Sequence, residues 1–146
     1  MISNTRKKKK KRDELKQSIL DDFNDKFNTE FDDFDDVILD RLDSEDFEHI
    51  DKDAIEDFKI YWETEYKEIE EINQVEEEVG SEFSYGCTLI EEDDFEDYCE
   101  ELVIDCGYIP KDFPSWIEID WEATASNMKQ DYSELDYQGI TYLFRA

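Results

Sequence analysis

Apolar residues recur every three or four positions between residues 53 and 78, and acidic residues fill most positions between them. This spacing predicts one long helix with a single apolar stripe. Eleven acidic residues and two lysines give these 26 residues a net charge of −9. At a rise of ~1.5 Å per residue, that is one charge per ~4 Å, close to the ~3.4 Å spacing along one DNA strand. The predicted stripe consists of Ile55, Phe58, Trp62, Tyr66, Ile69 and Ile72.

A second amphipathic pattern precedes this helix. Leu15, Ile19, Phe23 and Phe27 are four residues apart and predict a helix over residues 13–28. The apolar groups that follow are short and separated by acids, which favours short helices and turns over residues 29–53. Ser44 is a candidate N-cap for a helix over residues 45–50.

Residues 1–12 contain a run of basic residues and almost no apolar ones. We predict a disordered polybasic tail. Three roles stay open for it: a solvated tail, an arm that folds back on the acidic body, and a contact with nucleic acid or membrane.

The pattern changes after Gly80 and Ser81, which are typical of a helix end. Residues 83–90 are rich in aromatic and β-branched residues and predict a strand. A helix is expected from residue 95, with Gly107 as its cap, and two prolines predict a loop over residues 108–116. The stripe of that helix would contain Phe95, Tyr98, Cys99, Leu102, Val103 and Cys106, so both cysteines are expected in the core.

The C-terminal pattern predicts one more helix and a hairpin. Asp120 can cap a helix over residues 121–129. Residues 132–137 and 140–145 alternate as strands do and flank Gln138-Gly139, a pair suited to a tight turn. We therefore predict an α+β protein with an acidic helical N-terminal half, residues 13–80. A small C-terminal domain, residues 81–146, would hold a three-stranded antiparallel sheet and two helices.

Composition indicates a folded protein with an unusual charge. The chain has 146 residues, of which 14% are aromatic and need burial. The net charge is −28, and because seven basic residues lie between positions 6 and 12, residues 13–146 carry −35. Such a charge opposes compaction and repels nucleic acid and anionic lipid, so the expected partner is basic. No run of 18 apolar residues is present, and we expect a cytoplasmic protein without membrane contact.

No motif for catalysis or metal binding stands out. The three cysteines contain no Cys-x-x-Cys pair and are expected to be free thiols. His49 is the single histidine, and no Ser or Cys motif accompanies it. The acids near Asp51 lack the glycine of an EF-hand loop, and no glycine-rich phosphate loop occurs. We expect a protein that is not an enzyme and binds neither cofactor nor metal.

Three segments near the C-terminus resemble a known family. FEDYCEELVIDCGYI, IEIDWEATASNMKQDY and GITYLFR occur in this order and are similar to the C-terminal part of ArdA-type antirestriction proteins. The similarity covers residues 83–146. The positions that match are Phe95, Tyr98, Glu101, Asp105, Gly107, Ile119, Asp120, Trp121, Glu122, Asp131, Tyr132, Gly139, Tyr142 and Arg145.

This resemblance implies a function that agrees with the charge. Members of the family are acidic proteins of phages and mobile elements that imitate duplex DNA in the cleft of type I restriction–modification enzymes. We therefore expect carboxylates that stand in for phosphates and a host-cytoplasmic location. The candidate partner-binding residues are Glu56, Asp57, Glu63, Glu70, Glu71, Glu77, Glu78, Glu91, Glu92, Asp93, Asp94, Asp97, Glu100, Glu101 and Asp105.

The sequence leaves two matters open. An acidic binding module could instead sequester a basic histone-like protein of the nucleoid, or inhibit another DNA-binding defence complex. Exposed aromatic residues such as Trp116 or Tyr142 are candidates for a homodimer seam, and the oligomeric state stays open.

Overall fold

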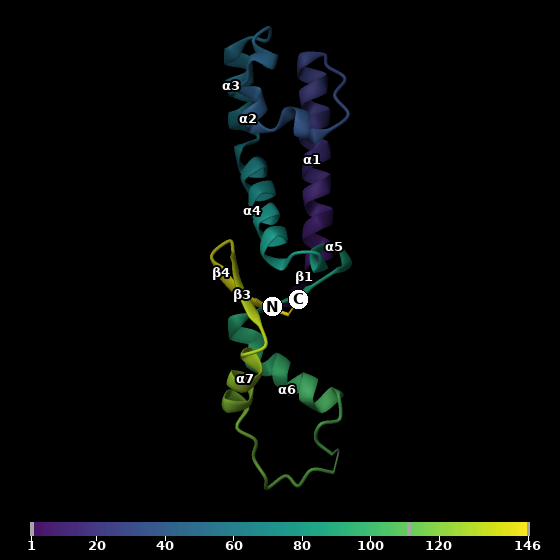
Figure 1. Cartoon of the computed structure of the whole chain (residues 1–146), viewed down its shortest axis with the longest axis vertical. Helices are drawn as coiled ribbons and strands as arrows, with labels where there is room; N and C mark the ends of the chain where they lie inside the picture. The colour runs from purple at the N-terminus through teal and green to yellow at the C-terminus, as the bar shows by residue number, and fades with distance from the viewer. Residues whose placement is uncertain (1, 111, 146) are drawn as a thin grey trace. The chain divides into compact units, whose positions relative to one another are not determined.

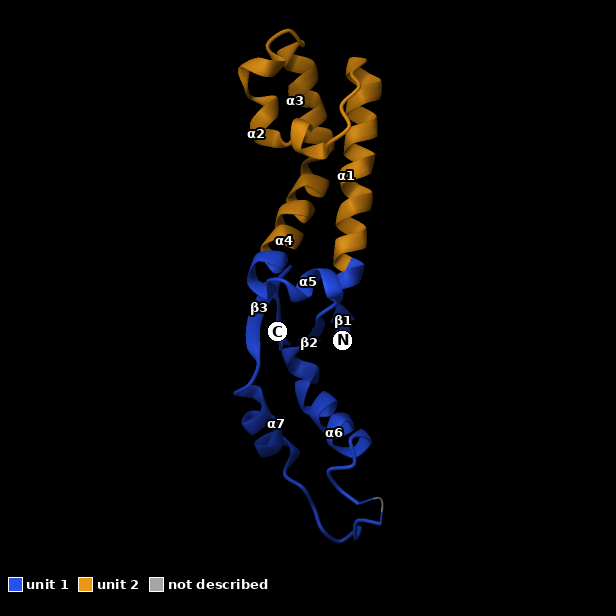
Figure 2. Cartoon of the chain, turned by 45° about the vertical axis from the view of Figure 1, so that its right-hand side comes forward, with its two compact units in different colours: residues 1–7, 75–146 blue, residues 8–74 orange. Residues whose placement is uncertain are grey.

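The computed structural model describes residues 2–110 and 112–145 (Figure 1). Met1, Lys111 and Ala146, which belong to the predicted tail, loop and C-terminal domain, lie outside the described residues. The chain divides into two compact units (Figure 2). The helical unit comprises residues 8–74, and the sheet unit comprises residues 1–7 and 75–146. This division differs from the predicted one because the first seven residues belong with the C-terminal region.

Long helices build the helical unit. The main part of α1 (Thr5–Phe27) lies beside α4 (Glu63–Val79) and runs antiparallel to it, and α3 (Lys52–Tyr61) continues along the same side (Figure 2). The Lys11 ammonium lies 2.6 Å from the Glu68 carboxylate, and the Arg12 guanidinium donates to the Asn73 side chain at 2.8 Å. These contacts fix the register of α1 against α4.

Aromatic rings fill the core of this unit. Phe23 is fully buried, and its ring centroid lies 4.6 Å from that of Phe27 and 5.2 Å from that of Phe58. The predicted stripes are confirmed: Ile55, Phe58, Tyr66, Ile69 and Ile72 are buried, and Trp62 packs against the core while half-buried. The residues that recur with the 3.6-residue period in the sequence are therefore those that form this core.

The segment between α1 and α3 consists of short helices and turns, as predicted. It contains η1 (Phe34–Val37), α2 (Leu39–Leu42) and η2 (Glu45–Phe47). The Asn24 side chain holds the start of the segment through hydrogen bonds to both the N–H and the C=O of Phe31. Ser44 occupies the N-cap position of η2, but its hydroxyl donates to the Arg41 carbonyl and makes no capping bond.

The predicted long helix is interrupted once. α3 ends at Tyr61 and α4 begins at Glu63, because Trp62 adopts φ −101° and ψ 9°. The Trp62 indole N–H donates to the Asp22 carboxylate of α1 at 2.7 Å. Periodicity could not reveal this break, since the apolar stripe passes through it unchanged.

The N-terminus is ordered, and the prediction of a disordered tail over residues 2–12 is wrong. Residues Ile2–Asn4 form strand β1, and the basic run forms the first turns of α1. Thr5 provides the anchor: its buried hydroxyl donates to the Phe83 carbonyl at 2.9 Å and accepts from the Cys87 N–H at 2.7 Å. A polar residue thus ties down a segment that has few apolar residues of its own.

The sheet unit contains an antiparallel sheet of four described strands in the order β1-β2-β4-β3. β2 spans Thr88–Glu91, β3 Ser133–Tyr137 and β4 Ile140–Phe144. The predicted mixture of helices with an antiparallel sheet is confirmed, and β1 adds a fourth strand to the three predicted. The predicted strand over residues 83–90 is shorter than expected, because Glu82–Tyr85 forms the short helix α5. Gln138 and Gly139 have φ of 52° and 78°, as a type I′ hairpin turn requires.

Two helices pack on this sheet. α6 (Phe95–Asp105) follows the short η3 (Glu92–Asp94). Asp120 caps α7 (Trp121–Lys129): its carboxylate accepts from the Ala123 N–H at 3.0 Å, which confirms the predicted cap. Cys106 is exposed, so its predicted core position is wrong. The helix ends at Asp105, one residue before Cys106, and the stripe stops there. One core cluster, between these helices and the sheet, consists of Ile90, Phe95, Cys99, Ala125 and Leu143.

None of the described helices is both long enough and apolar enough to cross a membrane.

Candidate functional site

The fifteen predicted carboxylates all lie at the protein surface. Eleven are exposed and four, Glu71, Glu91, Asp94 and Glu100, are half-buried; none is buried. The structure gathers them into two groups. One lies along α3 and α4 and contains Glu56, Asp57, Glu63, Glu70, Glu71, Glu77 and Glu78. The other runs from the end of β2 through η3 and α6 and contains Glu91, Glu92, Asp93, Asp94, Asp97, Glu100, Glu101 and Asp105.

The buried apolar stripe determines on which side of the helix the acids of the first group lie. Because Tyr66, Ile69 and Ile72 face the core, residues seven apart on the opposite side of α4 face solvent. Glu63 and Glu70 are such a pair. At ~1.5 Å per residue they are separated by about 10.5 Å along the helix.

Charges at the C-terminal end of α4 oppose its helix dipole, whereas Glu63 and Glu65 in its first turn agree with it. Its last turn contains three glutamates and no basic residue, although the C-terminal end of a helix carries partial negative charge. This arrangement costs stability locally. A protein tolerates such a conflict between local preference and sequence most often at a functional site.

The second group begins at a favourable place. Glu92, Asp93 and Asp94 form η3, and Glu96 and Asp97 lie in the first turn of α6, where the partial positive charge of the helix stabilises acids. Here the negative side chains lie at the positive end of the helix dipole, which stabilises the helix. The remaining acids of α6 follow on its exposed side because Phe95 and Cys99 face the sheet.

Lysines neutralise part of the acidic surface. Lys59 contacts Asp43 and lies 4.0 Å from Glu56, and Lys129 lies 3.2 Å from Glu92 and 3.3 Å from Glu134. Hydrogen bonds to these two carboxylates raise the pKa of Lys129. Ion pairs this exposed contribute little to stability.

The basic run of α1 also has acidic partners. Lys11 pairs with Glu68, and burial lowers the pKa of Lys8, with Lys11 acting in the same direction and Glu68 against it. Of the three predicted roles, the arm that folds back on acidic residues agrees with these contacts.

Groups suited to catalysis or metal binding are sparse. Burial raises the pKa of the Cys87 and Cys99 thiols, which makes both poor nucleophiles. His49 is exposed. Within residues 2–110 and 112–145, no group of three or more His, Cys, Asp or Glu side chains could hold a metal ion.

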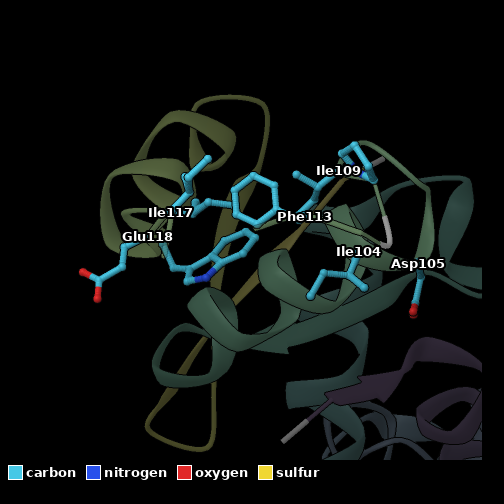
Figure 3. A pocket seen from close by; sticks show the side chains of 9 residues that line it. Ile104, Asp105, Ile109, Phe113, Ile117 and Glu118 are labelled. Carbon is cyan, nitrogen blue, oxygen red and sulfur yellow. The ribbon is translucent and has the colours of Figure 1, made fainter. Parts of the chain in front are cut away.

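A feature that we did not predict is a cavity of about 840 Å³ in the sheet unit, lined mostly by apolar residues (Figure 3). Its floor comes from the end of α6, and its walls come from the loop between α6 and α7. The sequence carried a signal for it, since this loop is rich in apolar residues within a very acidic chain. The lining residues are Ile104, Asp105, Ile109, Pro110, Phe113, Ile117, Glu118, Ile119 and Trp121.

The two aromatic residues considered for a dimer seam differ in exposure. Trp116 is 81% exposed and stays a candidate. Tyr142 is only 8% exposed, because β4 lies between β2 and β3, so the prediction that it is exposed is wrong.

Comparisons with protein-family models, with curated proteins and with solved structures found no match. The similarity to ArdA-type proteins thus stays a prediction from the sequence segments alone.

Proposed function

We propose that this protein is a DNA mimic that occupies the DNA-binding cleft of a type I restriction–modification enzyme and inhibits it. The observation that carries the proposal is the placement of all fifteen candidate carboxylates at the surface, eleven of them on α3, α4 and α6, helices whose opposite faces are buried. The resemblance of residues 83–146 to ArdA-type proteins supports this class of target.

The charge density of α4 matches that of a nucleic-acid strand. Its 17 residues contain eight acids and one lysine, a net charge of −7. At ~1.5 Å per residue this is one charge per ~3.6 Å, against ~3.4 Å for one strand of DNA. A basic groove that binds phosphates meets a similar density of negative charge on this helix.

The spacing of single carboxylates also fits. Glu63, Glu70 and Glu77 follow each other at intervals of seven residues, lie on one side of α4 and are all exposed. Their ~10.5 Å intervals correspond to about three nucleotide steps of a strand. Lysines and arginines arranged for every third phosphate can therefore pair with this row.

Rigid placement makes such carboxylates effective competitors. The helices are ordered by their own cores, so arranging the charges requires little further loss of conformational freedom on binding. Most of the affinity comes from charge, and we expect it to fall steeply as salt rises.

The deciding experiment measures DNA binding by a purified type I methyltransferase. At an equimolar ratio and low salt, we expect the protein to displace duplex DNA regardless of its sequence, and to lose this ability at about 0.5 M salt, where the Debye length is only ~4 Å. If DNA stays bound at low salt, the proposal fails. Should the protein instead form a complex with a histone-like protein under the same conditions, sequestration of a basic nucleoid protein becomes the better interpretation.

A further inference from the structure

The cavity of the sheet unit exposes residues that a folded protein normally buries. Ile104, on the last turn of α6, is 52% exposed, although apolar residues nearby in the chain, such as Phe95 and Cys99, are buried. Phe113 and Ile109 lie across from it on the loop, with their side chains directed toward the same space (Figure 3). A volume of about 840 Å³ falls in the ~300–1,000 Å³ range of ligand-binding pockets.

The margin of this cavity is acidic. Asp105 and Glu118 belong to its lining, and in Figure 3 their carboxylates lie on opposite sides of the apolar group. Residues 104–121, which supply the lining, contain four acids and one lysine. An occupant must therefore bring apolar groups for the centre and positive charges for both ends.

We propose that the cavity docks a cationic amphipathic segment of the partner protein. Its apolar side chains insert between Ile104 and Phe113, and lysine or arginine on either side pairs with Asp105 and Glu118. The identity of this partner as the DNA-binding target rests on the proposed function; the chemistry of the segment rests on the cavity alone.

Charge decides against two other occupants. A second copy of the chain would bring another acidic margin against this one, and like charges in such contact oppose association. Anionic lipid is repelled for the same reason. A basic segment is the occupant that gains from both the apolar centre and the acidic margin.

An apolar contact at the cavity gives the protein a source of affinity that salt does not screen, which the surface carboxylates alone do not provide. Ionic attraction to a basic cleft is distributed and falls with salt, whereas burial of apolar surface does not depend on screening. Docking at the cavity therefore adds affinity that persists at high salt, and it selects targets that have an apolar segment beside their basic groove.

A direct test uses fluorescence anisotropy with a labelled helical peptide of about 15 residues, with leucine on one face and lysine on the other. The control peptide has the same composition in an order that gives no apolar face. At low salt we expect both peptides to bind the wild-type protein. At about 0.5 M salt only the amphipathic peptide should remain bound, because the ionic part is then screened.

Variants assign this binding to the cavity. Ile104→Gln removes an exposed apolar side chain without changing the charge and should weaken amphipathic binding about fivefold, since half of an isoleucine side chain loses its burial in the complex. Ile60→Gln is the matched control, because Ile60 is 63% exposed on α3 in the helical unit and should leave binding unchanged. Glu118→Gln should weaken binding at low salt, whereas Glu14→Gln on α1 should not.

The outcomes separate this proposal from the proposed function. If both peptides bind equally at every salt concentration, or Ile104→Gln binds like wild type while circular dichroism shows an intact fold, the docking proposal is overturned, whatever the DNA-displacement assay gives. If the amphipathic peptide binds as described but DNA is not displaced, the proposed function fails and the cavity keeps its cationic occupant. Sedimentation that shows a dimer closed over the cavity would also overturn the proposal.

Discussion

Both units of this protein bury most of their apolar residues, but they differ in where the exposed ones lie: Ile60 and Tyr61 on α3 of the helical unit, and a group around a cavity in the sheet unit. In the helical unit, rings from several elements close around Phe23 and leave acids on the outside. In the sheet unit, a small cluster holds α6 and α7 on the sheet while Ile104 and Ile117 line a cavity and remain exposed. Both units thus display acids around a buried core, and the sheet unit adds a cavity with exposed apolar residues in its lining. This difference shows that acidic and exposed apolar side chains lie together in the sheet unit, around α6 and the loop that follows it.

The contrast predicts a large difference in the effect of apolar substitutions. Phe23→Ala should destabilise the protein by about 3–5 kcal/mol, because it leaves a cavity among rings that cannot close around it. Ile104→Ala should cost less than about 1 kcal/mol, since this side chain is already half exposed. Urea unfolding followed by circular dichroism measures both. Equal costs would show that the two units do not differ in this way.

The closed core should also make stability sensitive to high pH. Burial raises the pKa of Tyr66, whose phenol O–H donates to the Val37 carbonyl. In the unfolded chain its pKa is about 10, so the stabilisation is complete below pH ~10 and falls by about 1.4 kcal/mol per pH unit above it. The free energy of unfolding, measured from pH 9 to 12, should show this slope. In Tyr66→Phe the slope should be less steep by about 1.4 kcal/mol per pH unit, the contribution of one proton. An unchanged slope in the variant would exclude Tyr66 as its source.

The sheet unit depends on a buried hydroxyl at its N-terminal anchor. Thr5→Val should destabilise the protein by about 1–3 kcal/mol, because the Phe83 carbonyl and the Cys87 N–H lose their buried partner. Thr5→Ser keeps the hydroxyl and should recover most of this loss in the same unfolding assay. If the serine variant is as unstable as the valine variant, the methyl group and not the hydroxyl holds the segment.

Changes to the charged surface should have the smallest effect on stability. Reversing Glu63, Glu70 and Glu71 to lysine should alter the free energy of unfolding by less than about 0.5 kcal/mol each, because the positions lie outside the core. Inhibition of the target should weaken about fivefold per reversal, as expected for ~1 kcal/mol per exposed charge pair. Glu45→Lys, outside the candidate set, is the control and should have a smaller effect. Abolished inhibition by one reversal in a folded protein would contradict a distributed charge lattice.

Regular elements with a strong period were predicted well. The stripes of α1, α3 and α4, the Asp120 cap and the Gln138-Gly139 turn are all decided by residues close together in the sequence. Each depends on local geometry that one segment determines by itself. For the same reason the candidate carboxylates were expected at the surface, opposite the stripes.

Features that depend on distant residues were missed. The order of the basic N-terminus requires Phe83 and Cys87, 78 and 82 residues away from Thr5. The cavity was missed for another reason: its lining lies within residues 104–121, but the loop among them has no period from which its fold could be predicted. The hydrophobic pattern of one segment does not predict which other segments of the chain it contacts.

What the sequence alone determined is the large negative charge, the amphipathic helices and the side of each helix on which the acids lie, because these follow from residue type and the 3.6-residue period. Tertiary structure decided that a basic, polar N-terminus becomes a strand and a helix, that Trp62 interrupts the acidic helix, and that apolar residues near Ile104 stay open to solvent. The physical reason is that hydrogen bonds and packing between distant segments can outweigh the weak local preferences of the residues they join.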